Sequence, residues 1–269
     1  MILRRLALAA LTLAVTACGG SASTPNADPA GAGDDTTTTP ATTAAPTTAA
    51  PATTGAADTT TPPTTAAATP TDITFETGDG LTLEGRLYAA GPTFVVLGHM
   101  RPADQTSWFG FAERLQSAGY SALTYNNRGY GGSDDDGTLD VGTDALAAIA
   151  AARANGAERV IYMGASMNGA AALFAGANED LAGVVSLSGV LAFEGTSGID
   201  SARDVAEPKL LVAAEDDPGA VPNAQALFDA APEPREILVL ARGGHGTDML
   251  EANPDLAITL IEFVESVAG

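Results

Sequence analysis

The chain has 269 residues, of which 45% are hydrophobic and 5% aromatic, and 12 basic against 33 acidic residues give it a formal net charge of −21. This length predicts one sizeable core with extensions rather than two full domains. The acidic excess argues against a nucleic-acid groove and against electrostatic docking on anionic lipid, and it fits a neutral or cationic substrate better. The chain contains a single cysteine, which excludes an intramolecular disulfide, so the folded part depends on its core alone.

The first residues have the pattern of an export signal. Residues 1–5 are a basic start, and residues 6–15 are an apolar stretch too short to span a bilayer. The segment Val15-Thr16-Ala17-Cys18 resembles the lipobox of bacterial lipoproteins, in which the cysteine receives a lipid anchor and becomes the first residue of the mature chain. That interpretation predicts a signal peptide over residues 1–17, lipid attachment at Cys18 and a membrane anchor on the extracytoplasmic face. An ordinary secretory signal with an incidental cysteine is the alternative, and both interpretations predict export.

A low-complexity segment follows, rich in Thr, Ala and Pro. From residue 21 to residue 71 the sequence has no Ile, Leu, Val, Met, aromatic, Lys or Arg residue. Such a segment cannot bury a core, so residues 18–71 are predicted to be a disordered stalk. It is either a bare spacer or a carrier of O-linked sugar. The folded domain is predicted to comprise residues 72–269.

Within that domain, predicted strands and helices alternate. Residues 73–76 and 81–88 alternate in polarity around a glycine-containing turn, which predicts an antiparallel hairpin. Continuous apolar runs predict strands buried on both faces, and these runs are residues 94–97, 160–163, 184–187, 210–213 and 237–240, with a weaker one at 121–125. Helical patterns cover residues 108–118, 141–154, 167–177, 223–230 and 255–267. The alternation predicts an α/β fold with a doubly wound, mostly parallel sheet that begins with the hairpin.

A serine stands where one of these strands passes directly into a helix. Ser166 is flanked by Gly164 and Gly169, and small residues permit a very tight turn. Such a turn lifts the hydroxyl above the sheet edge, and the following helix N-terminus supplies free N–H groups beside it. Ser166 is therefore a candidate nucleophile. The alternative is a helix-capping serine with no chemical role.

A serine nucleophile needs a base and a carboxylate that orients the base. In hydrolases whose serine lies on a turn between a strand and a helix, the acid follows the serine in the chain and the histidine follows the acid. The chain has two histidines, and His245 lies in a glycine-rich loop directly after the last predicted strand. That position suits the base. Three acidic residues follow the preceding strand and are candidates for the carboxylate: Glu215, Asp216 and Asp217.

These motifs together resemble a compact α/β hydrolase, near the dienelactone-hydrolase-like and small esterase branches, over residues 72–269. In that family an Ala or Gly, two variable residues, an Asp and often a Pro follow the strand. Residues 214–218, Ala-Glu-Asp-Asp-Pro, match this pattern and make Asp217 the acid. The segment Gly98-His99-Met100-Arg101 corresponds to the family's His-Gly turn. The resemblance implies an oxyanion hole formed by the backbone N–H of Met167 and that of Met100 or Arg101.

The chain departs from the family pattern at two positions near these groups. Asn168 occupies the second glycine position of the usual Gly-x-Ser-x-Gly elbow, and Met100 replaces the glycine of the His-Gly turn. Neither change removes a reacting group. His99 is expected to fix the oxyanion turn. Residues 125–133 are similar to the family's Asp-x-Arg-Gly-x-Gly-x-Ser turn with Asn126 in place of the Asp, and Asn126 and Arg128 are expected to be scaffolding.

Three further residues follow the oxyanion turn: Asp104, Gln105 and Trp108. They either line the mouth of the pocket or serve as a helix cap and core residues. Only about twenty residues separate the strand that ends near Ser188 from the one that begins near Lys209, too few for the helical lid of many lipases. The sequence therefore predicts an open site.

The predicted reaction is hydrolysis of a small-molecule carboxylic ester through an acyl-enzyme on Ser166. No metal or organic cofactor is expected, because the sequence offers no clustered His or Cys ligands. The glycine-rich residues 128–133 lack the spacing of a dinucleotide fingerprint and the lysine of a P-loop. A serine peptidase with the same triad is one alternative. The other is a non-catalytic, surface-tethered binding module that has kept the fold.

Overall fold

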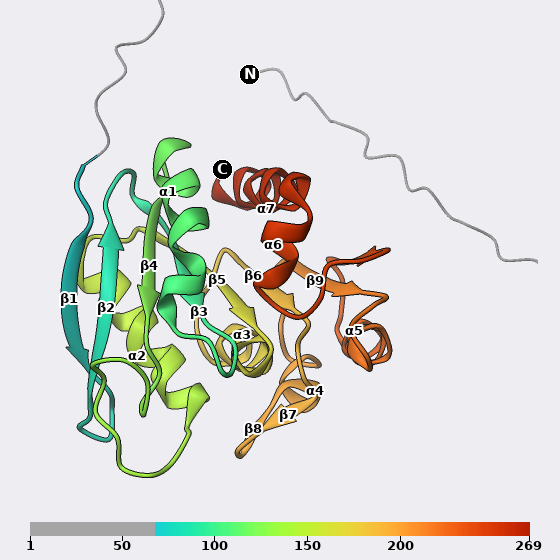
Figure 1. Ribbon diagram of the computed structural model, residues 1–269, viewed down its shortest axis with the longest axis horizontal. Helices are drawn as coiled ribbons and strands as arrows, with labels where there is room; N and C mark the ends of the chain where they lie inside the picture. The colour runs from blue at the N-terminus through green and yellow to red at the C-terminus, as the bar shows by residue number, and fades with distance from the viewer. Residues whose placement is uncertain (1–67) are drawn as a thin grey trace, which may run out of the picture. The chain divides into compact units, whose positions relative to one another are not determined.

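Figure 1 shows the computed structural model, in which residues 68–269 are described. An eight-stranded sheet runs through this region in the order β1-β2-β4-β3-β5-β6-β9-β10. The strands are β1 (Thr71–Glu76), β2 (Thr82–Tyr88), β3 (Thr93–Gly98), β4 (Ser121–Tyr125), β5 (Arg159–Ala165), β6 (Gly183–Leu187), β9 (Lys209–Ala214) and β10 (Arg235–Leu240). The predicted signal peptide, Cys18 and nearly all of the predicted stalk lie outside the described residues.

The direction of the strands matches the sequence prediction. β1 pairs antiparallel with β2, and β2 pairs antiparallel with β4. All the other pairings in this sheet are parallel. The N-terminal hairpin and the mostly parallel α/β sheet are thereby confirmed.

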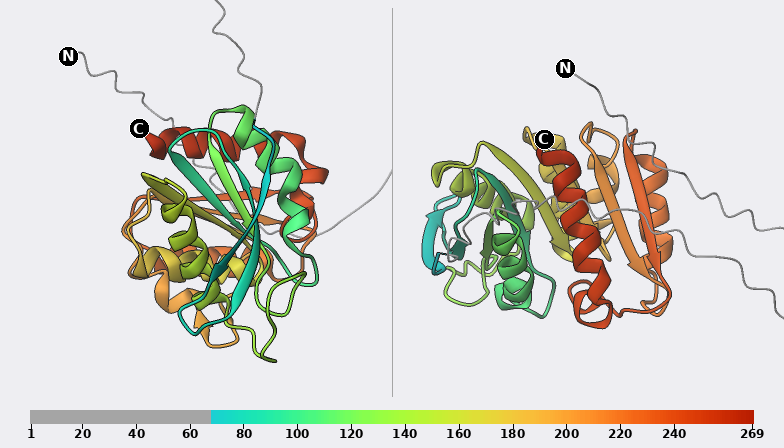
Figure 2. Two further views of the ribbon diagram at one scale, coloured as in Figure 1. Left: turned by 90° about the vertical axis from the view of Figure 1, so that its left-hand side faces the viewer. Right: turned by 90° about the horizontal axis from the view of Figure 1, so that it is seen from above.

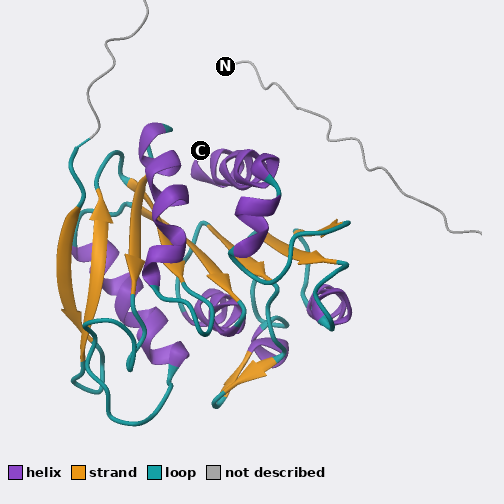
Figure 3. Ribbon diagram, in the orientation of Figure 1, coloured by secondary structure: helices purple, strands orange, loops and turns teal. Residues whose placement is uncertain are grey.

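Helices cover both faces of the sheet (Figures 1 and 2). One face is covered by α1 (Phe109–Ser117), which follows the short 3-10 helix η1 (Gln105–Trp108), and by α6 (Asp248–Ala252) and α7 (Pro254–Ala268). The other is covered by α2 (Val141–Ala154), α3 (Met167–Asn178), α4 (Gly198–Ser201) and α5 (Ala220–Ala230). Figure 3 shows this helix–sheet–helix layering by element type.

The central strands are apolar on both faces because each face meets a helical layer. In β5, Val160 and Tyr162 belong to the core beneath α2 and α3, whereas Ile161 and Met163 belong to the core beneath α1 and α7. The prediction of burial on both faces is wrong for β10. This strand pairs only with β9 in the described sheet, and Val239 is 41% exposed. An edge position leaves one side of the strand without a neighbour.

The segment between β6 and β9 is short and contains no cap domain, as expected. It forms the two-stranded hairpin of β7 (Ala192–Phe193) and β8 (Thr196–Ser197), followed by α4. No helix in residues 68–269 combines the length and the apolar character needed to cross a lipid bilayer.

The strand order contains a point at which the chain reverses its winding. β3 lies between β4 and β5, so the chain continues from β3 to one neighbour and later returns on the other side. In open parallel sheets, sites form at the carboxyl ends of strands at such a point. Ser166 follows β5 directly, and His99 follows β3.

Candidate active site

Ser166 occupies a strained turn between β5 and α3. Its backbone has φ 54° and ψ −109°, a region that non-glycine residues rarely adopt. Its N–H donates to Leu187 O at 2.8 Å, and its C=O accepts from Gly169 N–H at 2.9 Å, so the turn is fixed on both sides. The side chain makes no capping hydrogen bond to α3, and the residue as a whole is 9% exposed. The strained backbone therefore presents a hydroxyl that is not used as a helix cap.

Close backbone packing explains the small residues around the turn. A Cβ atom at Gly164 would overlap the backbone oxygen of Asn168. A Cβ atom at Gly169 would lie 2.6 Å from Gly189 Cα, on the loop after β6. Larger residues at these two positions would push α3 away from the sheet edge.

His245 and Asp217 are hydrogen-bonded across two loops at the same edge of the sheet. His245 Nδ1 lies 2.7 Å from Asp217 Oδ2. An ionised carboxylate only accepts, so it holds the proton of neutral imidazole on Nδ1 and leaves Nε2 free to act as a base. The Asp217 side chain is 10% exposed and that of His245 is 39% exposed. The imidazole therefore faces solvent while its acid partner is shielded.

The other two acidic candidates have different surroundings. Asp216 Oδ1 accepts from the backbone N–H groups of Gly243 and Gly244 at 2.8 and 3.0 Å, which fastens the histidine loop. Glu215 is exposed. Of the three acids, the structure brings Asp217 to the histidine.

The histidine loop packs against both the elbow and the oxyanion turn. Gly246 N–H donates to Ser188 Oγ at 3.0 Å. A Cβ atom at Gly246 would lie 2.7 Å from Met100 Sδ and 3.3 Å from Ala165 Cβ. The residue after His245 therefore lies against Met100 of the oxyanion turn and against Ala165, which precedes Ser166. No hydrogen bond joins Ser166 Oγ to His245 within the described part of the chain. Catalytic hydrogen bonds are commonly long in unliganded enzymes and tighten with substrate.

His99 is fully buried and has two fixed partners. Its Nε2 accepts from Asn127 N–H at 3.1 Å, and its Nδ1 lies 2.9 Å from Met100 O. Since a backbone N–H can only donate, the proton is on Nδ1 and donates to the Met100 carbonyl. Burial lowers the pKa of His99, so the ring is neutral. His99 therefore ties the turn after β3 to the loop after β4, the structural role expected for it.

The predicted oxyanion hole has donors available. The backbone N–H groups of Met100, Arg101 and Met167 donate to no other residue in the described range. Met167 is the first residue of α3, where an N–H has no partner within the helix. Met100 and Met167 are buried and Arg101 is exposed.

The turn after β4, which contains Asn126 and Arg128, is held by buried polar contacts. Arg128 is buried and bonds Asp144 Oδ1 at 2.9 Å and Asp79 Oδ2 at 2.8 Å. Burial opposes its charge, but the bonds to Asp79 and Asp144 outweigh this and raise the pKa of Arg128. Asn126 Oδ1 accepts from Gln105 N–H at 2.8 Å. Both residues are scaffolding, as expected.

The three residues after the oxyanion turn are a cap and core residues. Asp104 accepts from Thr106 N–H at the start of η1. Trp108 is buried and donates from Nε1 to Gly98 O at 3.0 Å, and the buried Gln105 accepts from Thr124 at 2.9 Å. The structure thus does not support Gln105 and Trp108 as residues of the pocket mouth.

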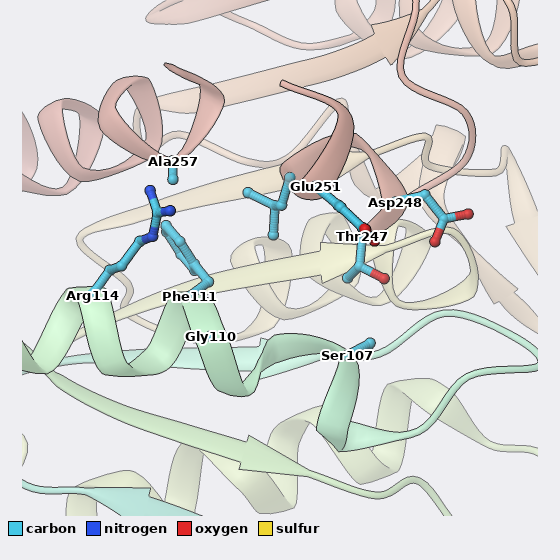
Figure 4. Close-up of a pocket in the computed structure, with 9 residues that line it drawn as sticks. Ser107, Gly110, Phe111, Arg114, Thr247, Asp248, Glu251 and Ala257 are labelled. Atoms are coloured by element: carbon cyan, nitrogen blue, oxygen red, sulfur yellow. The ribbon is translucent and has the colours of Figure 1, made fainter. Parts of the chain in front are cut away.

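A cavity of about 410 Å³ adjoins the histidine loop (Figure 4). It lies between α1 and the segment that follows His245, with Phe111 and Arg114 on one side and Thr247, Asp248 and Glu251 on the other. Neither Ser166 nor His245 lines this cavity, so it is a neighbour of the candidate site and not its centre. The described residues contain no group of three His, Cys, Asp or Glu side chains that could hold a metal ion.

The sheet order and the elbow define an α/β-hydrolase fold, and solved structures share it. An esterase from Pyrococcus furiosus aligns with a TM-score of 0.63 at 16% identity over 75% of this chain and 92% of that chain. An esterase domain from Rhodothermus marinus gives 0.62 at 19% identity over 75% and 100%. An esterase from Exiguobacterium antarcticum gives 0.64 at 16% identity over 72% and 100%. No protein-family model and no curated protein matches the sequence.

Proposed function

We propose that the protein is a serine hydrolase that cleaves carboxylic esters. One observation carries the proposal: His245 is hydrogen-bonded to Asp217 at 2.7 Å, and its loop packs against Ala165, the residue before the strained turn of Ser166. The unpaired N–H groups beside that turn and the fold shared with solved esterases support it further.

In the proposed mechanism, Ser166 Oγ attacks the ester carbonyl carbon while His245 Nε2 takes the hydroxyl proton. The negative charge on the carbonyl oxygen is stabilised by the N–H of Met167 and that of Met100 or Arg101. The C–O bond then breaks, and His245 protonates the departing alkoxide. Water attacks the acyl-enzyme in the same way, the carboxylic acid leaves, and the proton returns to Ser166. Asp217 holds the imidazole tautomer throughout.

The surroundings of the site favour small or surface-presented esters. The segment between β6 and β9 contains only a short hairpin and α4, and the His245 side chain is 39% exposed. A long acyl chain gains affinity by burial in an apolar tunnel. An open site offers less of that burial, so we expect the highest kcat/KM with short acyl chains.

The test combines covalent labelling with turnover. The purified protein is treated with a fluorophosphonate and its intact mass is measured, and p-nitrophenyl esters of increasing chain length are assayed alongside. We expect one adduct and ester hydrolysis, both lost in Ser166→Ala. Activity that persists in Ser166→Ala would refute the assignment of the nucleophile. A folded protein that neither labels nor hydrolyses would indicate a binding module, and cleavage of peptides in preference to esters would indicate a peptidase.

We also propose that the hydrolase is exported and held at the extracytoplasmic face of a membrane by lipid on Cys18. The support is the sequence of residues 1–18, which resembles a lipoprotein signal. The low-complexity residues that follow would act as a spacer between the anchor and the catalytic domain.

A further inference from the structure

Asn168 is a polar side chain buried directly beneath the elbow. It is the second residue of α3, two positions after Ser166, and is 0% exposed. Every polar atom of its amide has a partner, because Oδ1 lies 3.0 Å from Tyr125 OH and 2.9 Å from Tyr162 OH. Nδ2 donates to His99 O at 2.7 Å and to Asn127 Oδ1 at 2.6 Å. A buried amide with four partners is held in a single orientation.

The hydrogen-bond partners determine which atom of the Asn168 amide is the nitrogen and which is the oxygen. The His99 carbonyl can only accept, so the atom that faces it is the nitrogen. Asn127 is oriented in turn by Asp144, whose Oδ2 accepts from Asn127 Nδ2 at 3.3 Å. Asn127 therefore presents its oxygen to Asn168. The buried ion pair of Asp144 with Arg128 anchors the far end of this network.

Space for the Asn168 side chain comes from a glycine on the neighbouring strand. A Cβ atom at Gly98 would lie 2.7 Å from Asn168 Cγ and would overlap the Tyr162 hydroxyl. Gly98 is the last residue of β3 and immediately precedes His99. The Asn168 side chain thus occupies the space that a side chain at Gly98 would otherwise fill.

We propose that Asn168 is a positioning residue that sets the distance between the two halves of the oxyanion hole. This inference rests on the proposed hydrolase function. Its amide links α3, whose first N–H belongs to Met167, to the carbonyl of His99, the residue before Met100. His99 then fixes the turn through its bonds to Asn127 N–H and Met100 O. One side chain therefore holds the N–H of Met167 at a fixed distance from the N–H groups of Met100 and Arg101.

The test compares Asn168→Leu with Tyr125→Phe. Leucine has a similar volume but donates nothing to His99 O, so the turn after β3 loses its tie to α3. Tyr125→Phe removes one hydroxyl from the same network and leaves the bond from Nδ2 to His99 O in place, with Tyr162 still beside Oδ1.

For Asn168→Leu we expect kcat on a p-nitrophenyl ester to fall by roughly 10²-fold, which is comparable to the loss of one oxyanion donor. We expect KM to change by less than about threefold, because the substitution does not alter binding of the substrate in its ground state. For Tyr125→Phe we expect little change in either parameter.

A second measurement reports the position of the turn without any catalysis. The Asn127 amide donates to His99 Nε2, so its hydrogen exchange, followed by NMR, reports whether His99 is docked. We expect faster exchange in Asn168→Leu and unchanged exchange in Tyr125→Phe. If the leucine variant does not fold, the nearly isosteric Asn168→Asp replaces it. Raising the pH deprotonates the introduced carboxyl, which then repels the His99 carbonyl, so kcat falls and Asn127 exchange accelerates.

Three results would overturn the proposal. They are wild-type kcat in folded Asn168→Leu or in deprotonated Asn168→Asp, unchanged Asn127 exchange in the same variant, or equal kcat losses in Asn168→Leu and Tyr125→Phe that follow their losses of stability. Wild-type protein that neither labels nor hydrolyses would instead refute the proposed function. The exchange of the Asn127 amide would still decide whether Asn168 holds the turn.

Discussion

At the scale of single residues, the acidic side chains after β9 differ in their hydrogen-bond partners. Asp217 accepts from His245 Nδ1, and Asp216 accepts from two loop N–H groups. We expect Asp217→Asn to lower kcat by roughly 10⁴-fold, because the amide can donate to Nδ1 and so favours the wrong imidazole tautomer. Asp216→Asn keeps an oxygen that can accept from the loop, so we expect at most a small loss. Steady-state kinetics of the two variants check this, and a larger loss in Asp216→Asn would reverse the assignment.

The buried His99 makes stability depend on pH. Burial lowers its pKa in the folded protein below the ordinary value of 6.5. As the pH falls below about 6.5, the unfolded chain therefore binds a proton that the folded protein does not, and the free energy of unfolding decreases until the lowered pKa is reached. One such group contributes at most about 1.4 kcal/mol per pH unit.

His99→Gln removes this titration. We expect a shallower dependence of the unfolding free energy on pH in the variant just below pH 6.5, whatever its absolute stability. Urea unfolding at several pH values in both proteins measures the two slopes. Equal slopes would mean that His99 has the same pKa in the folded and unfolded chains.

At the scale of elements, the sequence predicts best the parts that meet two helical layers. The central strands and the five long helices lie where periodicity places them, because burial on both faces requires continuous apolar runs. β10 has the same apolar character, but its position at the sheet edge depends on long-range pairing that a local pattern does not contain. β7, β8 and α6 are too short to show a period. The start of η1 before residue 108 follows from the Asp104 cap.

The same distinction applies to the candidate site. Chain order nominated Ser166, His245 and three acidic residues, since each lies in a turn or loop after a strand. The resemblance to the family then selected Asp217 among the three acids. The partners of Asn168 could not be predicted, because they come together only through the register that pairs Gly98 with Tyr125 on one side and Gly164 on the other. The sequence shows that Asn168 and Met100 depart from the family pattern. It does not show that the missing side chain at Gly98 makes room for Asn168.

Two glycines in different surroundings, Gly98 in β3 and Gly110 in α1, test the packing around Asn168. A methyl group at Gly98 would meet Asn168 and Tyr162, whereas a Cβ atom at Gly110 in α1 meets nothing within 4 Å. We expect Gly98→Ala to destabilise the protein by about 1–3 kcal/mol, the typical cost of forcing an extra group into a packed core. Gly110→Ala should stabilise it by about 0.5–1 kcal/mol through helix propensity. Thermal unfolding of both variants measures the difference, and a neutral Gly98→Ala would show that the network has room to move.

At the scale of the whole molecule, the chemistry and the predicted anchor lie in separate parts of the chain. The candidate catalytic and oxyanion-hole residues fall between Met100 and His245, and the single cysteine is Cys18. The folded region therefore contains no thiol. A change at Cys18 should alter where the protein resides and leave its activity intact.

Cys18→Ala tests the anchor directly. In a bacterium that processes lipoproteins, we expect the wild-type chain to lose residues 1–17, carry lipid on Cys18 and enter the detergent phase on partitioning. Each buried methylene contributes about 0.8 kcal/mol, so two or more acyl chains anchor a protein stably where one does not. The Cys18→Ala variant should enter the aqueous phase with the same kcat per molecule, and mass spectrometry of the N-terminal peptide identifies the lipid. Equal partitioning of both proteins, with an unmodified cysteine, would leave an ordinary secretory signal as the explanation of the N-terminal sequence.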